Sequence, residues 1–165
     1  MKNGLFTMHS KLKIREISSV LDAEDIRQIR NSGMRFMTHN NMFITSEQQV
    51  NWFVNTYRPA RSKFDLIAFL GTARKSPVAY GMISKRPDKY WLSGVISDGY
   101  RGSGYGEQLF RHMIEFIFFF AERVWLDVFQ NNEPAIHLYK KLGFLEMERT
   151  NGIIIMYLDK ADYEV

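Results

Sequence analysis

The sequence predicts a mixed α/β domain in which helices flank a twisted, mostly antiparallel central sheet. Three strand-like runs at residues 64–70, 78–84 and 90–96 are joined by short polar turns, which favour antiparallel hairpins. A glycine-rich junction after the third run leads straight into an amphipathic helix pattern. Near the carboxyl end, an Asn-Gly pair is the strongest short signal for a further hairpin.

Size and composition fit one domain, so residues 1–165 are treated as a single unit. Hydrophobic residues make up 45% of the chain and aromatic residues 15%, which is enough for a sizeable core. The net charge of +4 suits an anionic ligand. The basic residues are nevertheless scattered, whereas nucleic-acid binders gather them on one face, so no nucleic-acid partner is expected. The absence of cysteine excludes disulfides and a thiolate nucleophile, and no His-Glu-x-x-His motif indicates a metal.

The expected location is the cytoplasm, without a membrane partner. Residues 1–10 lack the apolar core of a signal peptide. The most apolar run, residues 114–121, is far shorter than the roughly 20 residues that a membrane-spanning helix needs.

The first third of the chain predicts a strand and then a helix. Residues 12–17 alternate apolar and charged side chains, as a half-buried strand does. A helix is expected from near Asp22 to Gly33. Its apolar stripe would consist of Leu21, Ile26 and Ile29. Residues 34–43 have no clean period and are interpreted as irregular.

A second helix follows with an apparent capping box, in which Ser46 is the cap and Gln49 reaches back. The apolar positions at helical spacing are Val50, Phe53, Val54 and Tyr57. Pro59 is expected to end this helix. The polar turns of the following meander are placed at residues 71–77 and 86–89.

The second half predicts a helix, a strand, a helix and a final pair of strands. The helix after the glycine junction has one apolar face, made of Leu109, Met113, Phe116, Ile117 and Phe120. Residues 124–129 form a nearly continuous apolar run, which is typical of a strand buried on both faces. Asn132 caps the next helix and Gly143 ends it, and the last hairpin turns at residues 150–152.

The glycine junction itself predicts an anion site. Gly102, Gly104 and Gly106 allow a sharp turn and close approach to the backbone, and the helix that follows points its amino end at the loop. Phosphate is the usual occupant of this geometry. A nucleoside-triphosphate loop would need Lys-Ser or Lys-Thr where Tyr105-Gly106 stand, and a dinucleotide loop would need glycine at Glu107.

The remaining pattern, Arg-x-x-Gly-x-Gly at residues 101–106, resembles the pyrophosphate loop of the GNAT (GCN5-related N-acetyltransferase) superfamily. Residues 131–144 resemble a second motif of that superfamily, Asn-x-x-Ala-x-x-Leu-Tyr-x-x-x-Gly-Phe. The matching residues are Asn132, Ala135, Leu138, Tyr139, Gly143 and Phe144. The two motifs occur in the expected order, and the resemblance extends over residues 90–158.

The resemblance implies a GNAT fold with splayed central strands and acetyl-CoA as cosubstrate, with direct acetyl transfer to an amine. The pantetheine arm would pair with backbone groups of Gly94, Val95 and Ile96 in the splay, and Asn132 would lie close to it. The pyrophosphate would bind the loop formed by Arg101, Gly102, Ser103, Gly104, Tyr105 and Gly106. Tyr139 would be the general acid for the departing thiolate.

The general base is left open between three groups. Asp127 stands in a Leu-Asp-Val triplet where some relatives of the superfamily carry glutamate, and its carboxylate is one methylene shorter. A structural role for Asp127 is an equal alternative. His39 lies in the irregular segment, and a chain of water molecules is the third option.

Residues 30–53 loosely resemble superfamily members that acetylate nucleotide-linked amino sugars and carry a Trp-Phe pair, here Trp52-Phe53. Their usual histidine is replaced near Gln49 or Val50. A small-molecule amine is therefore the favoured acceptor, with a protein N-terminus, as in ribosomal-protein acetyltransferases, as the alternative. A non-catalytic acyl-CoA-binding module is a further alternative, and the sequence is compatible with a homodimer.

Overall fold

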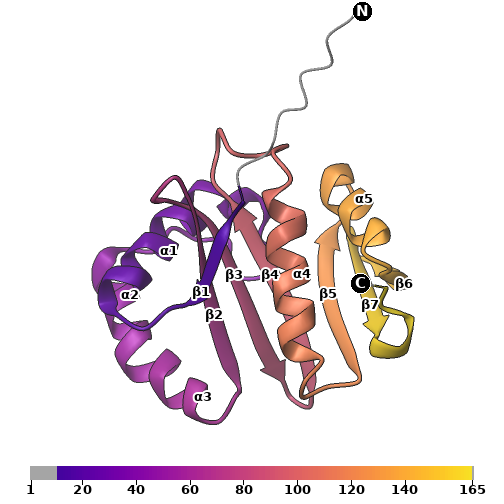
Figure 1. The fold of residues 1–165 in the computed structure, drawn as a ribbon, viewed down its shortest axis with the longest axis horizontal. Coiled ribbons are helices and arrows are strands. Elements are labelled where there is room, and N and C mark those ends of the chain that lie inside the picture. Colours follow the sequence, from indigo (N-terminus) through magenta and orange to yellow (C-terminus); the bar gives the residue numbers. More distant parts are fainter. Residues whose placement is uncertain (1–10, 165) are drawn as a thin grey trace, which may run out of the picture.

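The computed structural model describes residues 11–164 and shows one seven-stranded sheet with the strand order β1-β2-β3-β4-β5-β7-β6 (Figure 1). The signal-peptide prediction for residues 1–10 lies outside the described residues. The strands are β1 (Lys13–Glu16), β2 (Leu66–Ala73), β3 (Ser76–Arg86), β4 (Lys89–Ile96), β5 (Arg123–Phe129), β6 (Leu145–Thr150) and β7 (Ile153–Asp159). Neighbouring strands are antiparallel except β4 and β5, which confirms the predicted mixed α/β class.

Helices cover both faces of the sheet. They are α1 (Val20–Ser32), α2 (Ser46–Trp52), α3 (Arg58–Ser62), α4 (Tyr105–Ile117) and α5 (Glu133–Lys141), with 3₁₀ turns η1 (Met34–Phe36) and η3 (Lys160–Asp162) and a π turn η2 (Phe53–Tyr57). Successive side chains of a strand point to opposite faces. On β3, Ala79 and Ile83 accordingly join the core beneath α4, while Tyr80 joins the core beneath α1 and α2. Within the described residues, no helix has the length and apolar character needed to cross a membrane.

The structure moves the start of α1 two residues ahead of the predicted Asp22, because Ser19 is the cap. The Ser19 hydroxyl accepts a hydrogen bond from the Asp22 N–H, and the Asp22 carboxylate bonds back to Ser19. Ile26 and Ile29 are buried as predicted, but Leu21 is 78% exposed. The apolar stripe of α1 is therefore narrower than the sequence pattern indicates.

The cap of α2 is also shifted, from the predicted Ser46 to Thr45, which pairs with Gln48. Gln49 consequently turns inward and is buried, while Val50 is partly exposed. Pro59 does not end the helix. It lies in the first turn of α3, directly after the π turn η2, where the hydrogen-bond pattern already changes and a missing N–H is tolerated.

The predicted turn at residues 71–77 is shorter in the structure, where β2 continues to Ala73. The reversal needs only Arg74 and Lys75, which adopt positive φ angles of 49° and 68°. At the final hairpin, Asn151 and Gly152 have φ angles of 49° and 77°, which confirms the predicted Asn-Gly turn.

The central feature for function is the divergence of β4 from β5. The two parallel strands pair only through Tyr90–Val124 and Trp91–Trp125. Beyond Trp91 the strands separate, while α4 connects them and runs in front of the sheet between them (Figure 1). The predicted splay of the central strands is therefore confirmed.

Candidate active site at the splayed strands

The predicted backbone contacts of β4 divide between two sides of the strand. The Ser97 N–H donates to the Val78 carbonyl at 2.9 Å, so alternate residues before Ser97 direct their backbone groups toward β3. Val95 is one of them, and Gly94 and Ile96 face the gap toward β5 instead. Two of the three predicted residues thus present backbone groups in the splay.

The Val95 side chain has a packing role. Its Cγ1 atom lies 2.3 Å from the point that a Cβ atom on Gly33 would occupy. Only glycine at position 33 lets the end of α1 approach β4 this closely. On the opposite face, a Cβ on Gly94 would lie 2.9 Å from the Phe110 ring of α4, so a second glycine is required there.

The glycine loop leaves open space beside its backbone in front of α4, and this open space is called the hollow below. Gly102 and Gly104 have φ angles of 74° and 79°, and no heavy atom lies within 4 Å of a Cβ built on either residue. No side chain caps α4, so the amide groups of Gly106 and Glu107 have no hydrogen-bond partner in the described chain. Uncapped amides at the positive end of a helix fit a diphosphate group. The hollow therefore fits the anionic part of the implied cosubstrate.

Arg101 is directed away from this hollow. Its Nε donates to the Ile96 carbonyl at 3.0 Å, and its Nη1 forms an ion pair with Asp98 at 2.5 Å. The guanidinium also lies over the Phe36 ring, with 4.6 Å between Cζ and the ring centroid. Asp98 also pairs with Arg35 at 3.6 Å, so one carboxylate faces two guanidinium groups, and the contacts of Arg101 with Ile96 and Asp98 anchor the loop.

The other predicted loop residues have structural contacts of their own. The Ser103 hydroxyl donates to the Tyr100 carbonyl and closes the turn. Tyr105 begins α4, and its buried ring packs near Tyr100. Across the splay, Asn132 caps α5 by accepting the Ala135 N–H at 3.4 Å. That bond uses the Asn132 Oδ1 atom and leaves its Nδ2 group available to a ligand.

Tyr139, the predicted general acid, is held by aromatic packing on α5. Its ring centroid lies 5.0 Å from that of Phe110 and 6.0 Å from that of Phe144. The ring is buried, while the hydroxyl makes no hydrogen bond within residues 11–164 and is not sealed from its surroundings. Burial, together with the negative charge of Asp127, raises the pKa of Tyr139 above its ordinary value. The phenol therefore remains a proton donor at neutral pH.

Two of the three candidate bases meet in the structure. The His39 Nε2 atom lies 2.7 Å from Asp127 Oδ2, and the Thr38 hydroxyl donates to Asp127 Oδ1. The carboxylate is largely buried, whereas 62% of the His39 side chain is exposed. Sequence reasoning named Asp127 and His39 only as alternatives and missed Thr38, which carries no signal beyond being next to His39.

A cavity of about 400 Å³ opens between α1, α2, β3 and the segment that joins α1 to α2. It is lined by Ile26, Arg30, Asn40, Met42, Phe43, Ile44, Gln48, Gln49, Trp52, Tyr80 and Met82. Asn40 in its wall directly follows His39 in the chain, whereas His39 and Asp127 themselves are not among the lining residues. Of the predicted Trp-Phe pair, Trp52 lines the cavity, whereas Phe53 is buried in the core.

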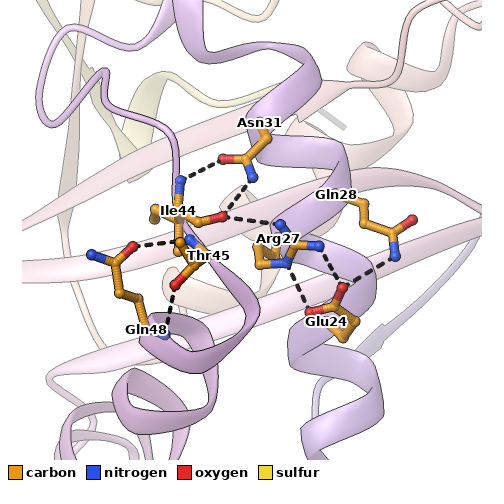
Figure 2. A network of polar contacts seen from close by, with 7 residues as sticks. All are labelled: Glu24, Arg27, Gln28, Asn31, Ile44, Thr45 and Gln48. Atoms are coloured by element: carbon orange, nitrogen blue, oxygen red, sulfur yellow. Dashed lines mark hydrogen bonds and ion pairs between the residues drawn. The ribbon is translucent and has the colours of Figure 1, made fainter.

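A polar network fixes the wall of this cavity to α1 (Figure 2). The Asn31 side chain bonds both to the Ile44 N–H at 3.0 Å and to its carbonyl at 2.8 Å. Arg27 donates to the same carbonyl at 3.0 Å and pairs with Glu24. The connecting segment is therefore held at Ile44, and the cavity has a defined shape.

Comparison with known proteins shows similarity over most of the chain. The model of the acetyltransferase (GNAT) family matches residues 26–144. Streptothricin acetyltransferase of Streptomyces lavendulae is 42% identical over 53 residues, 30% of this chain and 26% of that relative. Spermine/spermidine N(1)-acetyltransferase of Bacillus subtilis (strain 168) is 32% identical over 59 residues, 34% of this chain and 39% of that relative. The matches thus span well under half of either relative.

Among solved structures, yncA of Salmonella typhimurium, determined with its cofactor acetyl-CoA, has a TM-score of 0.73 at 16% identity. The similarity covers 90% of this chain and 93% of that one. At this level of identity the comparison establishes the fold.

Proposed function

The chain belongs to the acetyltransferase (GNAT) family, a family of acetyl-CoA-dependent enzymes, and on that premise we propose that it transfers an acetyl group from acetyl-CoA directly to a primary amine of a small molecule. The observation that carries the proposal is the junction of the β4–β5 splay with the open glycine loop. The splay exposes backbone groups, and the loop at its end exposes helix amides. Together they form a continuous track for a long, anionic thioester.

Each end of this track has a distinct binding role. The amides of Gly106 and Glu107 would hold the diphosphate, and the backbone of Gly94 and the N–H of Ile96, whose carbonyl already accepts from Arg101, would pair with the pantetheine amides. Asn132 would donate to the same arm from α5. When bound, acetyl-CoA supplies the activated acetyl group, and the chain's residues orient it and move protons.

Removal of the amine proton is assigned to His39, positioned by Asp127. With Nε2–H donating to the carboxylate, the imidazole keeps its lone pair on Nδ1, where it can accept a proton. The short side chain of Asp127 cannot extend far from β5, and His39 extends that reach. Thr38 fixes the second carboxylate oxygen, so the pair has one preferred orientation.

Protonation or hydrogen-bond stabilisation of the leaving thiolate is assigned to Tyr139. Its hydroxyl is unused within the described chain, and its environment keeps it protonated. A phenol with a raised pKa is a weak acid, so donation of a strong hydrogen bond to sulfur is its main contribution. An intact donor at this position favours catalysis over the alternative of a non-catalytic acyl-CoA-binding module.

A small acceptor is favoured over a protein N-terminus by the form of the cavity. Its volume of about 400 Å³ is in the range of small-molecule sites, and Asn40 and Phe43 form part of its wall. No Asp or Glu is among the described residues that line it, whereas an open acidic groove would suit a peptide amine. A nucleotide-linked amino sugar remains the favoured acceptor, supported by Trp52 in the lining.

An acceptor screen that measures the free thiol of released CoA tests this proposal. The chain contains no cysteine, so a thiol reagent gives no protein background. The screen would include amino sugars, their nucleotide conjugates, spermidine, aminoglycosides and peptides with free N-termini. We expect turnover with an amino-sugar acceptor. Turnover with peptides alone would support the protein N-terminus instead, and no turnover with any amine would contradict the proposed function.

A further inference from the structure

The cavity beside α1 contains a buried positive charge that no residue neutralises. Arg30 is 7% exposed, and in the described chain it forms no ion pair. Its two hydrogen bonds go to backbone carbonyls, with Nη1 at 2.9 Å from the Met42 oxygen and Nη2 bonded to the Asn40 oxygen. The other strongly buried charge, Asp22, is paired with Arg15. Arg30 is therefore exceptional, because a buried charge normally has an opposite partner.

Much of the hydrogen-bonding capacity of Arg30 is unused. A guanidinium has five N–H donors in a planar fork, and only two are occupied here. The carbonyl contacts hold the fork in place at the cavity wall. Planar forks of this kind match carboxylate and phosphate oxygens in a bidentate manner.

Two further polar groups of the same cavity lack strong partners. Gln49 is 5% exposed as a residue and lines the cavity, and its side-chain amide makes no hydrogen bond to the described residues. Because no described side-chain nitrogen or oxygen is both buried and unpaired, this amide is accessible rather than sealed in the core. The Tyr80 hydroxyl has only the thioether of Met82 as acceptor, at 3.3 Å. The Gln49 amide therefore offers a donor and an acceptor to a molecule in the cavity. Burial also raises the pKa of Tyr80, which keeps this hydroxyl a donor.

We propose that this cavity recognises an oxyanionic group, a carboxylate or a phosphate, on the acceptor amine, with Arg30 as its principal donor and Gln49 and Tyr80 beside it. The inference rests on the proposed function and specifies its acceptor. The anionic group would be held at Arg30, and the amine would extend past Asn40 toward His39. A polycation without an oxyanion would meet the Arg30 charge with no lining carboxylate to offset it.

Matched acceptor pairs test the inference. Glucosamine 6-phosphate against glucosamine isolates a phosphate, and 2,4-diaminobutyrate against 1,3-diaminopropane isolates a carboxylate. For one pair we expect kcat/KM to be at least about tenfold higher for the member with the oxyanion, and that pair identifies the source of the anion. Arg30→Gln should raise KM for the member with the oxyanion, so that the ratio of kcat/KM between the two members of the pair falls to near one. Arg30→Lys should restore part of this ratio.

Arg61→Gln is the control for loss of an arginine, because Arg61 pairs with Glu16 and neither lines the cavity nor contacts its wall. It should leave the ratio unchanged. If Arg30→Gln fails to fold, Gln49→Leu keeps the Arg30 contacts and should still lower the ratio. A ratio near one for both pairs in the wild-type protein, or an unchanged ratio in Arg30→Gln, would overturn the inference.

Binding without catalysis separates this inference from the proposed function. Thermal shifts are measured with glucosamine 6-phosphate and 2,4-diaminobutyrate in the absence of acetyl-CoA. A shift that Arg30→Gln abolishes, without acetylation of any amine, supports the oxyanion site and contradicts the proposed function. Equal acetylation of both members of each pair supports the function and overturns the oxyanion site. The absence of any Arg30-dependent shift also counts against the site.

Discussion

Tyr139→Phe should lower kcat at least about tenfold while leaving the affinity for CoA nearly unchanged. General acids contribute about 10²–10⁴-fold, and water can replace part of that contribution. The hydroxyl acts mainly in the transition state, where negative charge grows on sulfur, so binding of the ground state is spared. Packing against Phe110 and Phe144 depends on the ring, which the variant keeps. Steady-state kinetics and a CoA titration measure the two quantities.

Tyr163→Phe is the control for loss of a tyrosine hydroxyl. The Tyr163 hydroxyl contacts Arg111 and Glu115 outside the proposed site, so this variant should retain full kcat. Because its environment raises the pKa of Tyr139, the phenol stays protonated over roughly pH 6 to 9, and kcat should not fall with its ionisation in that range. A fully active Tyr139→Phe protein would assign Tyr139 a packing role only.

His39→Ala should reduce kcat by about 10²–10⁴-fold at saturating acetyl-CoA, because it removes the proton acceptor for the amine. The side chain is mostly exposed, so the free energy of unfolding should change little. Added imidazole should restore part of the activity, which a merely structural histidine would not allow. Asp127→Asn should also lower kcat, and the double variant should lose little beyond His39→Ala because the two residues act as one unit.

His137→Ala serves as the control for this experiment, since His137 is an exposed histidine on α5. It should be fully active and insensitive to imidazole. Full activity of His39→Ala, with no imidazole effect, would transfer the role of base to a chain of water molecules. If Asp127→Asn lost activity while His39→Ala stayed active, Asp127 would instead be the direct base.

The turn of the glycine loop and the Asn132 cap could be predicted from the sequence because their constraints are local. Gly102 and Gly104 are required by positive φ angles, and Asn132 caps a helix within three residues of itself. Constraints of this local kind leave a recognisable pattern in the amino-acid sequence. The splay was implied by the family resemblance rather than by any single residue, and the structure reports it through the short pairing of β4 with β5.

Features that depend on the choice between similar local patterns were predicted less well. Thr45-x-x-Gln48 and Ser46-x-x-Gln49 both fit a capping box, and the burial of one helix face selects the first. The shift moves Gln49 from a capping role into the lining of the cavity beside α1. Proline normally ends a helix because it lacks an N–H donor, but the π turn before Pro59 lets the helix continue.

Residues whose role depends on long-range contacts could not be predicted. Arg30 has the sequence signature of an ordinary helix-surface charge, and only the folded segment at Asn40 and Met42 buries it. Arg101 matches the loop motif, yet its side chain contacts Asp98 and Phe36, which no local pattern predicts. His39 and Asp127 are 88 positions apart in sequence, and no local pattern predicts their pairing.

Titration with CoA tests most directly the central claim that the glycine loop holds the cosubstrate through its backbone. At about 100 times the dissociation constant, CoA or acetyl-CoA should stabilise the wild-type fold by roughly 2.7 kcal/mol, a rise in Tm of roughly 5 to 10 °C. Gly104→Val should weaken binding more than Arg101→Ala, because a side chain blocks the open space beside the backbone, whereas Arg101 is already bonded to Asp98 and the Ile96 carbonyl.

Gly152→Val is the control for backbone strain. Gly152 has nearly the same φ angle as Gly104 and the same open surroundings, but it lies in the final hairpin. The account predicts a clear ligand-induced shift for the wild-type protein and for Gly152→Val, and a shift that is lost in Gly104→Val. The absence of any shift at millimolar CoA or acetyl-CoA in the wild-type protein, or a greater loss in Arg101→Ala than in Gly104→Val, would contradict it.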